Sequence, residues 1–244
     1  MIPGSGDFTR QLRSKAESYF ERFVHHPFQK ALREGTLSPG SFGRYLTQDA
    51  LYLLEDARAF TRVAERCEEE SLDANPGLST EWLAFHSDAA LFFRAMASDS
   101  YALEQAMQNH FFRLYQLSPA SEPSEVCGAY SRFLLQHAEN APIPVALAAL
   151  LPCFWLFQEA ALEPWVKPNP YQPWLTTYGG ELYLAFTEKC IGILEESINL
   201  YSHRKITECA IEAFLAAALW ECQFLDEASQ SSPDRFKKGS IEGS

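Results

Sequence analysis

Apolar side chains recur every three or four positions along nearly the whole chain, and strict alternation of apolar and polar positions is almost absent. A spacing of three or four gathers apolar residues on one face of an α-helix, whereas alternation is typical of a half-buried strand. The sequence therefore predicts an all-α fold of about eight helices. They are expected over residues 4–33 (broken at 26–27), 41–67, 80–97, 100–117, 125–139, 144–163, 180–202 and 206–229.

The segments between these helices are rich in residues that favour turns and loops. Ser41 is expected to cap the helix that begins there, and the proline-rich stretch 164–174 is expected to be irregular. None of these connections has the character of a linker between domains. A single helical-bundle domain is predicted over residues 1–230, followed by a polar, disordered tail at 231–244.

Composition narrows the class of protein. The 244 residues are 47% hydrophobic and 14% aromatic, enough for a sizeable core. No run approaches the roughly 20 apolar residues that span a bilayer, and the N-terminus lacks the pattern of a signal peptide. The expectation is a soluble, cytoplasmic protein without a membrane partner. A formal net charge of −12 also argues against binding to nucleic acid.

The metal-binding residue types show no metal-site spacing. The six cysteines include no CxxC pair, and the six histidines form neither an HExxH nor an ExxH pattern. Reduced thiols and no metal are expected, which disfavours a di-iron oxidase.

One cysteine stands out because it follows a proline inside a long apolar and aromatic run. Proline is tolerated in the first turn of a helix, so Pro152 predicts that Cys153 lies near a helix start. There the helix dipole would favour the nucleophilic thiolate. The alternative is an inert buried thiol, the more common state of free cysteine.

Two carboxyls are candidates for chemistry. Asp49 and Tyr52 are three residues apart, so they share one face of an otherwise apolar helix. Asp49 could await a cationic or amine ligand, or pair with Arg44 or Arg58 of its own helix. Glu221 follows eight largely apolar residues, where burial would suit a general acid or base. Its alternative is a place on the polar stripe of an amphipathic helix.

Three further rings complete the candidate set, namely Tyr130, Phe157 and Tyr178, each of which could equally be core. One thiol, two carboxyls and several rings would suit a flat heterocycle that carries an amino group.

Several stretches resemble segments of the TenA (thiaminase II) family, in the order that the family has them. The matching stretches are Tyr45-Leu-Thr-Gln-Asp49-Ala-Leu-Tyr52-Leu, His26-Pro-Phe28 with Gly35-Thr-Leu37, Ala148-Ala-Leu-Leu-Pro-Cys153-Phe-Trp155, Asn169-Pro-Tyr171 with Trp174 to Gly180, and Trp220-Glu221-Cys-Gln-Phe224. Together they cover roughly residues 25–225.

The resemblance implies a heme-oxygenase-like all-α domain that assembles as a homo-oligomer, a dimer or a tetramer. The implied activity is hydrolysis of aminomethyl-pyrimidine to hydroxymethyl-pyrimidine and ammonia, with thiamin cleavage in some members and no metal or organic cofactor. Cys153 would be the nucleophile and Glu221 the acid/base. Asp49 would hold the pyrimidine, with Tyr52, Tyr130 and Tyr178 as pocket tyrosines.

This chain departs from the family pattern at two places. Phe157 stands where many members have a tyrosine, which removes a hydrogen-bond donor near the thiol. The pair Glu55-Asp56 replaces residues that are more often apolar or aromatic. A non-catalytic binder of a small heterocycle is therefore a competing interpretation. The choice among thiamin, aminomethyl-pyrimidine, a formylated precursor and another amine also stays open.

Overall fold

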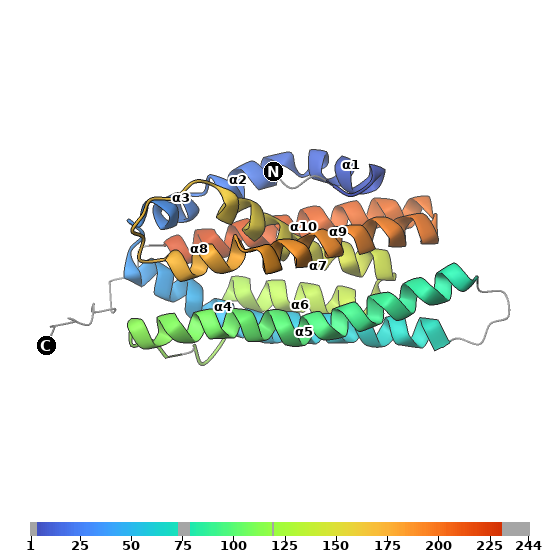
Figure 1. Cartoon of the computed structure of the whole chain (residues 1–244), viewed down its shortest axis with the longest axis horizontal. Coiled ribbons are helices and arrows are strands. Elements are labelled where there is room, and N and C mark those ends of the chain that lie inside the picture. The colour runs from blue at the N-terminus through green and yellow to red at the C-terminus, as the bar shows by residue number, and fades with distance from the viewer. Residues whose placement is uncertain (1–3, 73–78, 119, 231–244) are drawn as a thin grey trace, which may run out of the picture.

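The computed structural model describes residues 4–72, 79–118 and 120–230, so the predicted tail at 231–244 lies outside the described residues. Within those ranges the chain forms ten helices and no strand (Figure 1), which confirms the all-α prediction. The helices are α1 (Asp7–Lys15), α2 (Glu17–Val24), α3 (Pro27–Glu34), α4 (Pro39–Leu72), α5 (Thr80–Leu114), α6 (Glu125–Asn140), α7 (Ile143–Leu162), α8 (Gln172–Tyr178), α9 (Glu181–Tyr201) and α10 (Arg204–Ser229).

The predicted break at 26–27 is present, and its cause is local. The ring of His26 accepts a hydrogen bond from the backbone N–H of Phe28 at 3.1 Å, and Pro27 occupies the first position of α3. A second break, at Ala16 between α1 and α2, was not predicted. The cap of α4 was assigned to the wrong residue, because the hydroxyl of Ser38 accepts from the backbone N–H of Ser41 at 3.0 Å.

Helix α5 differs most from the helices predicted from the sequence. It runs unbroken from Thr80 to Leu114, where two helices ending and beginning near 98–100 were expected. Ser98 and Asp99 are exposed, so these polar residues belong to the solvent face of one continuous helix. The stretch 164–174 was expected to be irregular throughout, but α8 begins within it.

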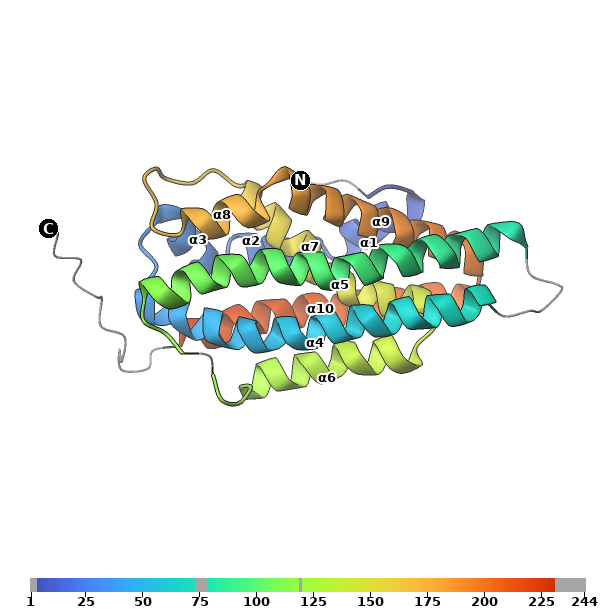
Figure 2. The same ribbon diagram turned by 60° about the horizontal axis from the view of Figure 1, so that its bottom comes forward.

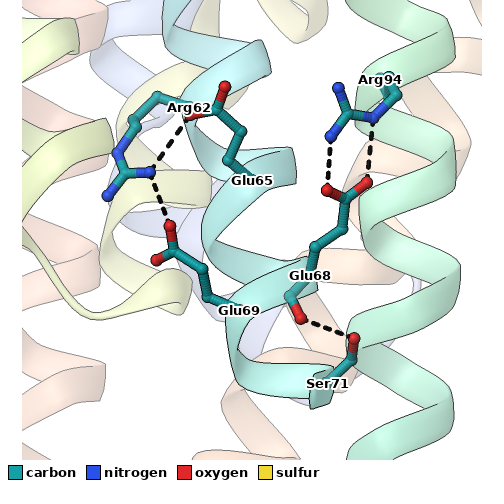
Figure 3. Close-up of polar contacts among 6 residues, drawn as sticks. All are labelled: Arg62, Glu65, Glu68, Glu69, Ser71 and Arg94. Carbon is teal, nitrogen blue, oxygen red and sulfur yellow. Dashed lines mark hydrogen bonds and ion pairs between the residues drawn. The ribbon is translucent and has the colours of Figure 1, made fainter. Parts of the chain in front are cut away.

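The long helices α4 and α5 form an antiparallel pair, and α6 packs along α4 (Figure 2). Exposed ion pairs lie on the surface near the C-terminal end of α4, where α5 packs against it (Figure 3). Arg94 of α5 donates two hydrogen bonds to Glu68 of α4, at 3.0 and 2.6 Å. Such surface pairs contribute little stability, with a median of about 0–1 kcal/mol each, so apolar packing holds the helices together.

Helix α7 is the core of the bundle and packs against α10, α9, α6, α2, α4 and α8. Every residue from Ile143 to Ala161 is buried. By length and composition α7 could cross a membrane, contrary to the expectation that no such run exists, yet 94% of its most apolar stretch is buried inside the protein. A largely apolar helix that other helices surround needs no lipid to cover it.

Two sets of polar contacts join helix α1 to this core. Glu195 of α9 accepts hydrogen bonds from the backbone N–H groups of Phe8 and Thr9, at 3.1 and 2.7 Å. This carboxylate satisfies the otherwise unpaired donors at the start of α1. In the interior, Arg13 contacts Glu159 of α7 through two hydrogen bonds of 3.2 and 3.0 Å.

Candidate active site

Helix α4 contributes one face of the site. Asp49, Tyr52 and Asp56 follow one another at three- and four-residue spacing, so they line the same side of the helix. Their exposed fractions are 5%, 4% and 3%. This face therefore carries two acidic groups into an interior that is otherwise built from apolar and aromatic side chains.

Asp49 bonds across the bundle to Gln108 and interacts with the hydroxyl of Tyr45 on its own helix, and it pairs with neither arginine that the sequence offered. Its Oδ2 accepts a hydrogen bond of 2.7 Å from Nε2 of Gln108 on α5. The alternative partners are engaged elsewhere, since Arg44 bonds the carbonyl of Ala228 and Arg58 pairs with Glu55. Burial raises the pKa of Asp49 to about 7, so the carboxyl can exist in either form near neutral pH.

Glu221 lies in the interior and not on a solvated stripe, with an exposed fraction of 3%. Its Oε1 accepts a hydrogen bond of 2.7 Å from the hydroxyl of Tyr130. The ring of Tyr130 in turn stacks on Tyr52, with centroids 5.1 Å apart and planes at 25°. Burial raises the pKa of Glu221 to about 8, which places its titration in the range that an acid/base group needs.

Phe157 and Tyr178 form the aromatic wall between α7 and α8. Their ring centroids are 5.3 Å apart, and Trp174 lies 4.6 Å from Tyr178. The hydroxyl of Tyr178 donates a 2.7 Å hydrogen bond to Oε2 of Glu104. Burial raises the pKa of Glu104 well above its ordinary value. The hydroxyl that Phe157 lacks is therefore not replaced by Tyr178, which is committed to Glu104.

Cys153 is not near a helix start, so that prediction was wrong. Helix α7 begins at Ile143 and continues through Pro152, which leaves the thiol near the middle of the helix and out of reach of the dipole. Burial raises the pKa of the Cys153 thiol well above its ordinary value, and the charges of Glu221, Asp56 and Glu104 raise it further. The resting group is a neutral thiol, and a base must take its proton before it can attack.

The structure thus gathers all seven predicted side chains into one buried region where α4, α6, α7, α8 and α10 meet; their chemical roles stay predictions. It adds polar groups that were not singled out from the sequence, namely Glu104, Gln108 and the hydroxyl of Tyr183. Glu104 and Gln108 are one turn apart on α5. That spacing was the available signal, but it was hidden by the expectation of a helix break just before it.

Two of the surface grooves bear on where the site can be reached from outside. The larger, of about 620 Å³, lies between α6, α7 and α10 and is lined by none of the predicted site residues. The second, of about 230 Å³, is lined by Tyr45 and Phe224 among others. Phe224 also contacts Tyr52 with centroids 6.1 Å apart, so this groove adjoins the buried site from outside.

No metal site is formed by the described residues: they contain no group of three or more His, Cys, Asp or Glu placed to hold an ion. The arrangement of four buried carboxyls and a thiol is instead suited to proton transfer and to a ligand that brings positive charge.

The chain is similar in sequence to a known protein family and to several of its relatives. The sequence profile of the TENA/THI-4/PQQC family matches residues 10–231. An aminopyrimidine aminohydrolase of Bacillus subtilis is 27% identical over 225 residues, which cover 89% of this chain and 87% of that protein. A thiamine biosynthesis multifunctional protein of Corynebacterium glutamicum is 28% identical over 94% of this chain, but the chain spans only 28% of that protein's length.

Solved structures agree on the fold. A TenA homologue from Pyrococcus furiosus superposes with a TM-score of 0.74 at 19% identity and covers 91% of this chain and 100% of its own. A domain from Shewanella denitrificans with a heme oxygenase-like fold has a TM-score of 0.53 at 13% identity, with 92% of each chain covered. The predicted heme-oxygenase-like architecture is thereby confirmed.

Proposed function

Because the chain belongs to the TENA/THI-4/PQQC family, we propose that it is a thiamin-salvage hydrolase. The proposed reaction converts 4-amino-5-aminomethyl-2-methylpyrimidine and water into the hydroxymethyl-pyrimidine and ammonia, and thiamin is a second candidate substrate. The observation that carries the proposal is the buried contact of Glu221 with Tyr130, in the same interior as Cys153 and the Asp49–Gln108 pair. The relative from Bacillus subtilis that bears the name aminopyrimidine aminohydrolase supports it.

We assign Asp49 as the residue that binds the pyrimidine ring of the substrate. A carboxyl can bond both the exocyclic amino group and the adjacent ring nitrogen of an aminopyrimidine, and a charge-assisted bond favours the protonated ring. Gln108 holds Oδ2 of Asp49 in position at 2.7 Å. Tyr52 and Tyr130, stacked on each other, are the rings available beside it for a flat heterocycle.

The chemistry begins with the neutral thiol of Cys153. We assign Glu221 as the base: with a pKa of about 8 it is mostly protonated at pH 7, and the fraction present as carboxylate accepts the thiol proton and later returns it. The thiol passes its proton to Glu221 as sulfur bonds to a ring carbon, and the electron pair then expels the exocyclic amine as ammonia; a neutral amine takes the proton of Glu221 as it leaves, whereas an ammonium already carries that proton. Water adds at the exocyclic carbon and its proton passes to the buried carboxyls, and the C–S bond breaks as the sulfur takes a proton back from Glu221.

A non-catalytic binder is the second candidate. It is favoured by one observation, the raised pKa of the Cys153 thiol, which disfavours the reactive thiolate in the resting protein. Both candidates predict binding of an aminopyrimidine, so affinity does not distinguish them.

Steady-state release of ammonia from aminomethyl-pyrimidine by the purified protein is the deciding measurement. Turnover that is proportional to protein concentration and lost in Cys153→Ser supports the hydrolase. Saturable binding of the same compound without release of ammonia would instead favour the non-catalytic binder over the hydrolase.

A further inference from the structure

Asp56 is a buried acidic residue that the proposed chemistry does not use. Its exposed fraction is 3%, and its Oδ1 accepts no hydrogen bond from the described residues. The neighbouring Glu55 behaves differently, because its side chain is 29% exposed and pairs with Arg58 at 2.6 Å. Of the two acids that depart from the family pattern, one therefore faces outward and the other faces the core.

Asp56 and Cys153 lie in the same part of the protein core. Phe154, the residue after Cys153, packs its ring against Phe60 of α4 at 5.6 Å and against Tyr183 of α9 at 5.4 Å. Phe60 lies one turn beyond Asp56 on α4. The charge of Asp56 also raises the pKa of the Cys153 thiol and of the Tyr183 hydroxyl, after the larger effect of burial.

No positive charge neutralises this region: in the described part of the chain, no ion pair joins Asp49, Asp56, Glu104 or Glu221 to a basic residue. The titratable groups that interact with Asp56 are Asp49 and Tyr52 on α4, Glu104 on α5, Cys153 on α7, Tyr183 and Cys190 on α9, and Glu221 on α10. All of them are acids, thiols or phenols.

Asp56 differs from the other buried carboxyls in its hydrogen bonding: among the described residues its Oδ1 has no donor, and the hydroxyl of Tyr52, four residues earlier on α4, interacts with the carboxyl and lowers its pKa. Asp49 has Gln108, Glu104 has Tyr178 and Glu221 has Tyr130, each at 2.7 Å. Among the described residues, the hydroxyl of Tyr183 is also buried without a hydrogen-bond partner, and that of Tyr52 has none at normal hydrogen-bond geometry, although it interacts with Asp56 and Cys153. Buried polar atoms without full hydrogen bonds are unfavourable, so three incompletely bonded groups around one thiol indicate a position that a ligand group completes.

A primary ammonium is the group that fits best. It brings one positive charge and three N–H donors, and it therefore satisfies a carboxylate more fully than a neutral amide or a thiazolium ring without N–H groups. Asp49 and Asp56 are seven residues apart on one helix, or about 10 Å along its axis. This separation suits a small molecule with a ring at Asp49 and an amine toward Asp56.

We propose that Asp56 is a specificity-determining residue that holds the protonated exocyclic amine of the substrate beside Cys153. The inference rests on the proposed function, because it takes the pyrimidine ring to be bound at Asp49. It names the substrate class as aminopyrimidines with a free ammonium group, in preference to formylated or thiazolium-bearing analogues.

The kinetic test compares Asp56→Asn with the matched control Glu55→Gln. The substrates are aminomethyl-pyrimidine, its N-formyl derivative and thiamin. We expect Asp56→Asn to lower kcat/KM for the amine by about 10- to 100-fold and to change the formylated compound by less than about threefold. Glu55→Gln should leave all three unchanged. Equal losses on all substrates, or no loss on the amine, would overturn the inference.

A binding test separates this inference from the proposed function. Burial raises the pKa of Asp56 to about 8, against the lowering effect of the Tyr52 hydroxyl and with a smaller rise from the charge of Asp49, so the empty carboxyl is mostly protonated at pH 7. An ammonium bound there favours the carboxylate, and a proton is released.

Calorimetric titration of aminomethyl-pyrimidine into Cys153→Ser, in buffers of different ionisation enthalpy, measures that proton. We expect the double variant Cys153→Ser/Asp56→Asn to release up to about one proton fewer per ligand. Equal proton release in the two would overturn the inference, even if the wild-type protein hydrolyses the amine. The expected difference would support it, even if no ammonia is formed.

Discussion

Replacing Glu221 with Gln is expected to lower the catalytic rate and, at high pH, to raise the stability of the fold. The amide occupies the same space and its oxygen can still accept from the hydroxyl of Tyr130, now 2.7 Å from Oε1. It cannot carry a proton to the leaving amine or from water. We therefore expect kcat to fall by about 10²–10⁴ and one limb of the pH–rate profile to disappear.

The stability change follows from the pKa of the buried carboxyl. Burial raises the pKa of Glu221 from 4.5 to about 8, so the folded protein holds this proton more tightly than the unfolded chain does. The stability that Glu221 contributes is therefore fully present below pH 4.5 and declines as pH rises toward about 8. At about 1.4 kcal/mol per pH unit the loss reaches roughly 3 kcal/mol at pH 7.

Gln does not titrate and avoids this loss. Its amide nitrogen replaces one carboxyl oxygen, however, and needs an acceptor, which costs about 1–3 kcal/mol if none is found. We therefore expect the free energy of unfolding of Glu221→Gln to rise above wild type by about 1–3 kcal/mol at pH 8. Near pH 5 the advantage should vanish.

Urea unfolding at pH 5 and pH 8, together with ammonia release, measures both effects. Glu212→Gln on the same helix is the matched control, because Glu212 is exposed, and it should be silent in stability and rate. A Glu221→Gln protein with wild-type turnover and a pH-independent difference in stability would refute both the burial effect and the acid/base role.

Three other variants test separate parts of the structure. Cys153→Ser should lower kcat by about 100-fold or more because a hydroxyl is a poorer nucleophile, whereas Ser at the buried Cys67 should leave ammonia release intact; equal losses would argue against a special thiol. Asp49→Asn should reduce kcat/KM by about 2–3 kcal/mol, and a loss of thermal stability with unchanged kinetics would make Asp49 structural. Arg13→Met removes the guanidinium bonded to the buried Glu159 and should lower the free energy of unfolding by about 3 kcal/mol in urea, with kcat unchanged; an unaltered midpoint would show that the pair contributes nothing.

The helical architecture could be predicted from the sequence because periodicity is a local property. Apolar spacing located α6, α7, α9 and α10 to within two residues of their observed ends and α4 to within five, and His26-Pro27 marked a true boundary. The family segments also brought out seven residues that do converge in one buried region. Each of those signals is carried by residues close together in the chain.

What the tertiary structure decided is which polar residues face inward. Ser98 and Asp99 suggested a break, but packing along α4 keeps α5 continuous and leaves them on its solvent face. Pro152 suggested a helix start, but the surrounding helices bury α7 on all sides and carry it through the proline, so the thiol lies in the middle of the helix and stays neutral.

The same reason explains why Asp56 could be noticed but not interpreted from the sequence. Glu55 and Asp56 are adjacent acids with nearly the same local propensity, and one residue of rotation about the helix separates a solvated ion pair from a buried carboxyl. Only the positions of α5, α7, α9 and α10 around α4 determine which of the two meets water. Local sequence sets the helix, and long-range packing sets the environment, and hence the protonation state, of each side chain upon it.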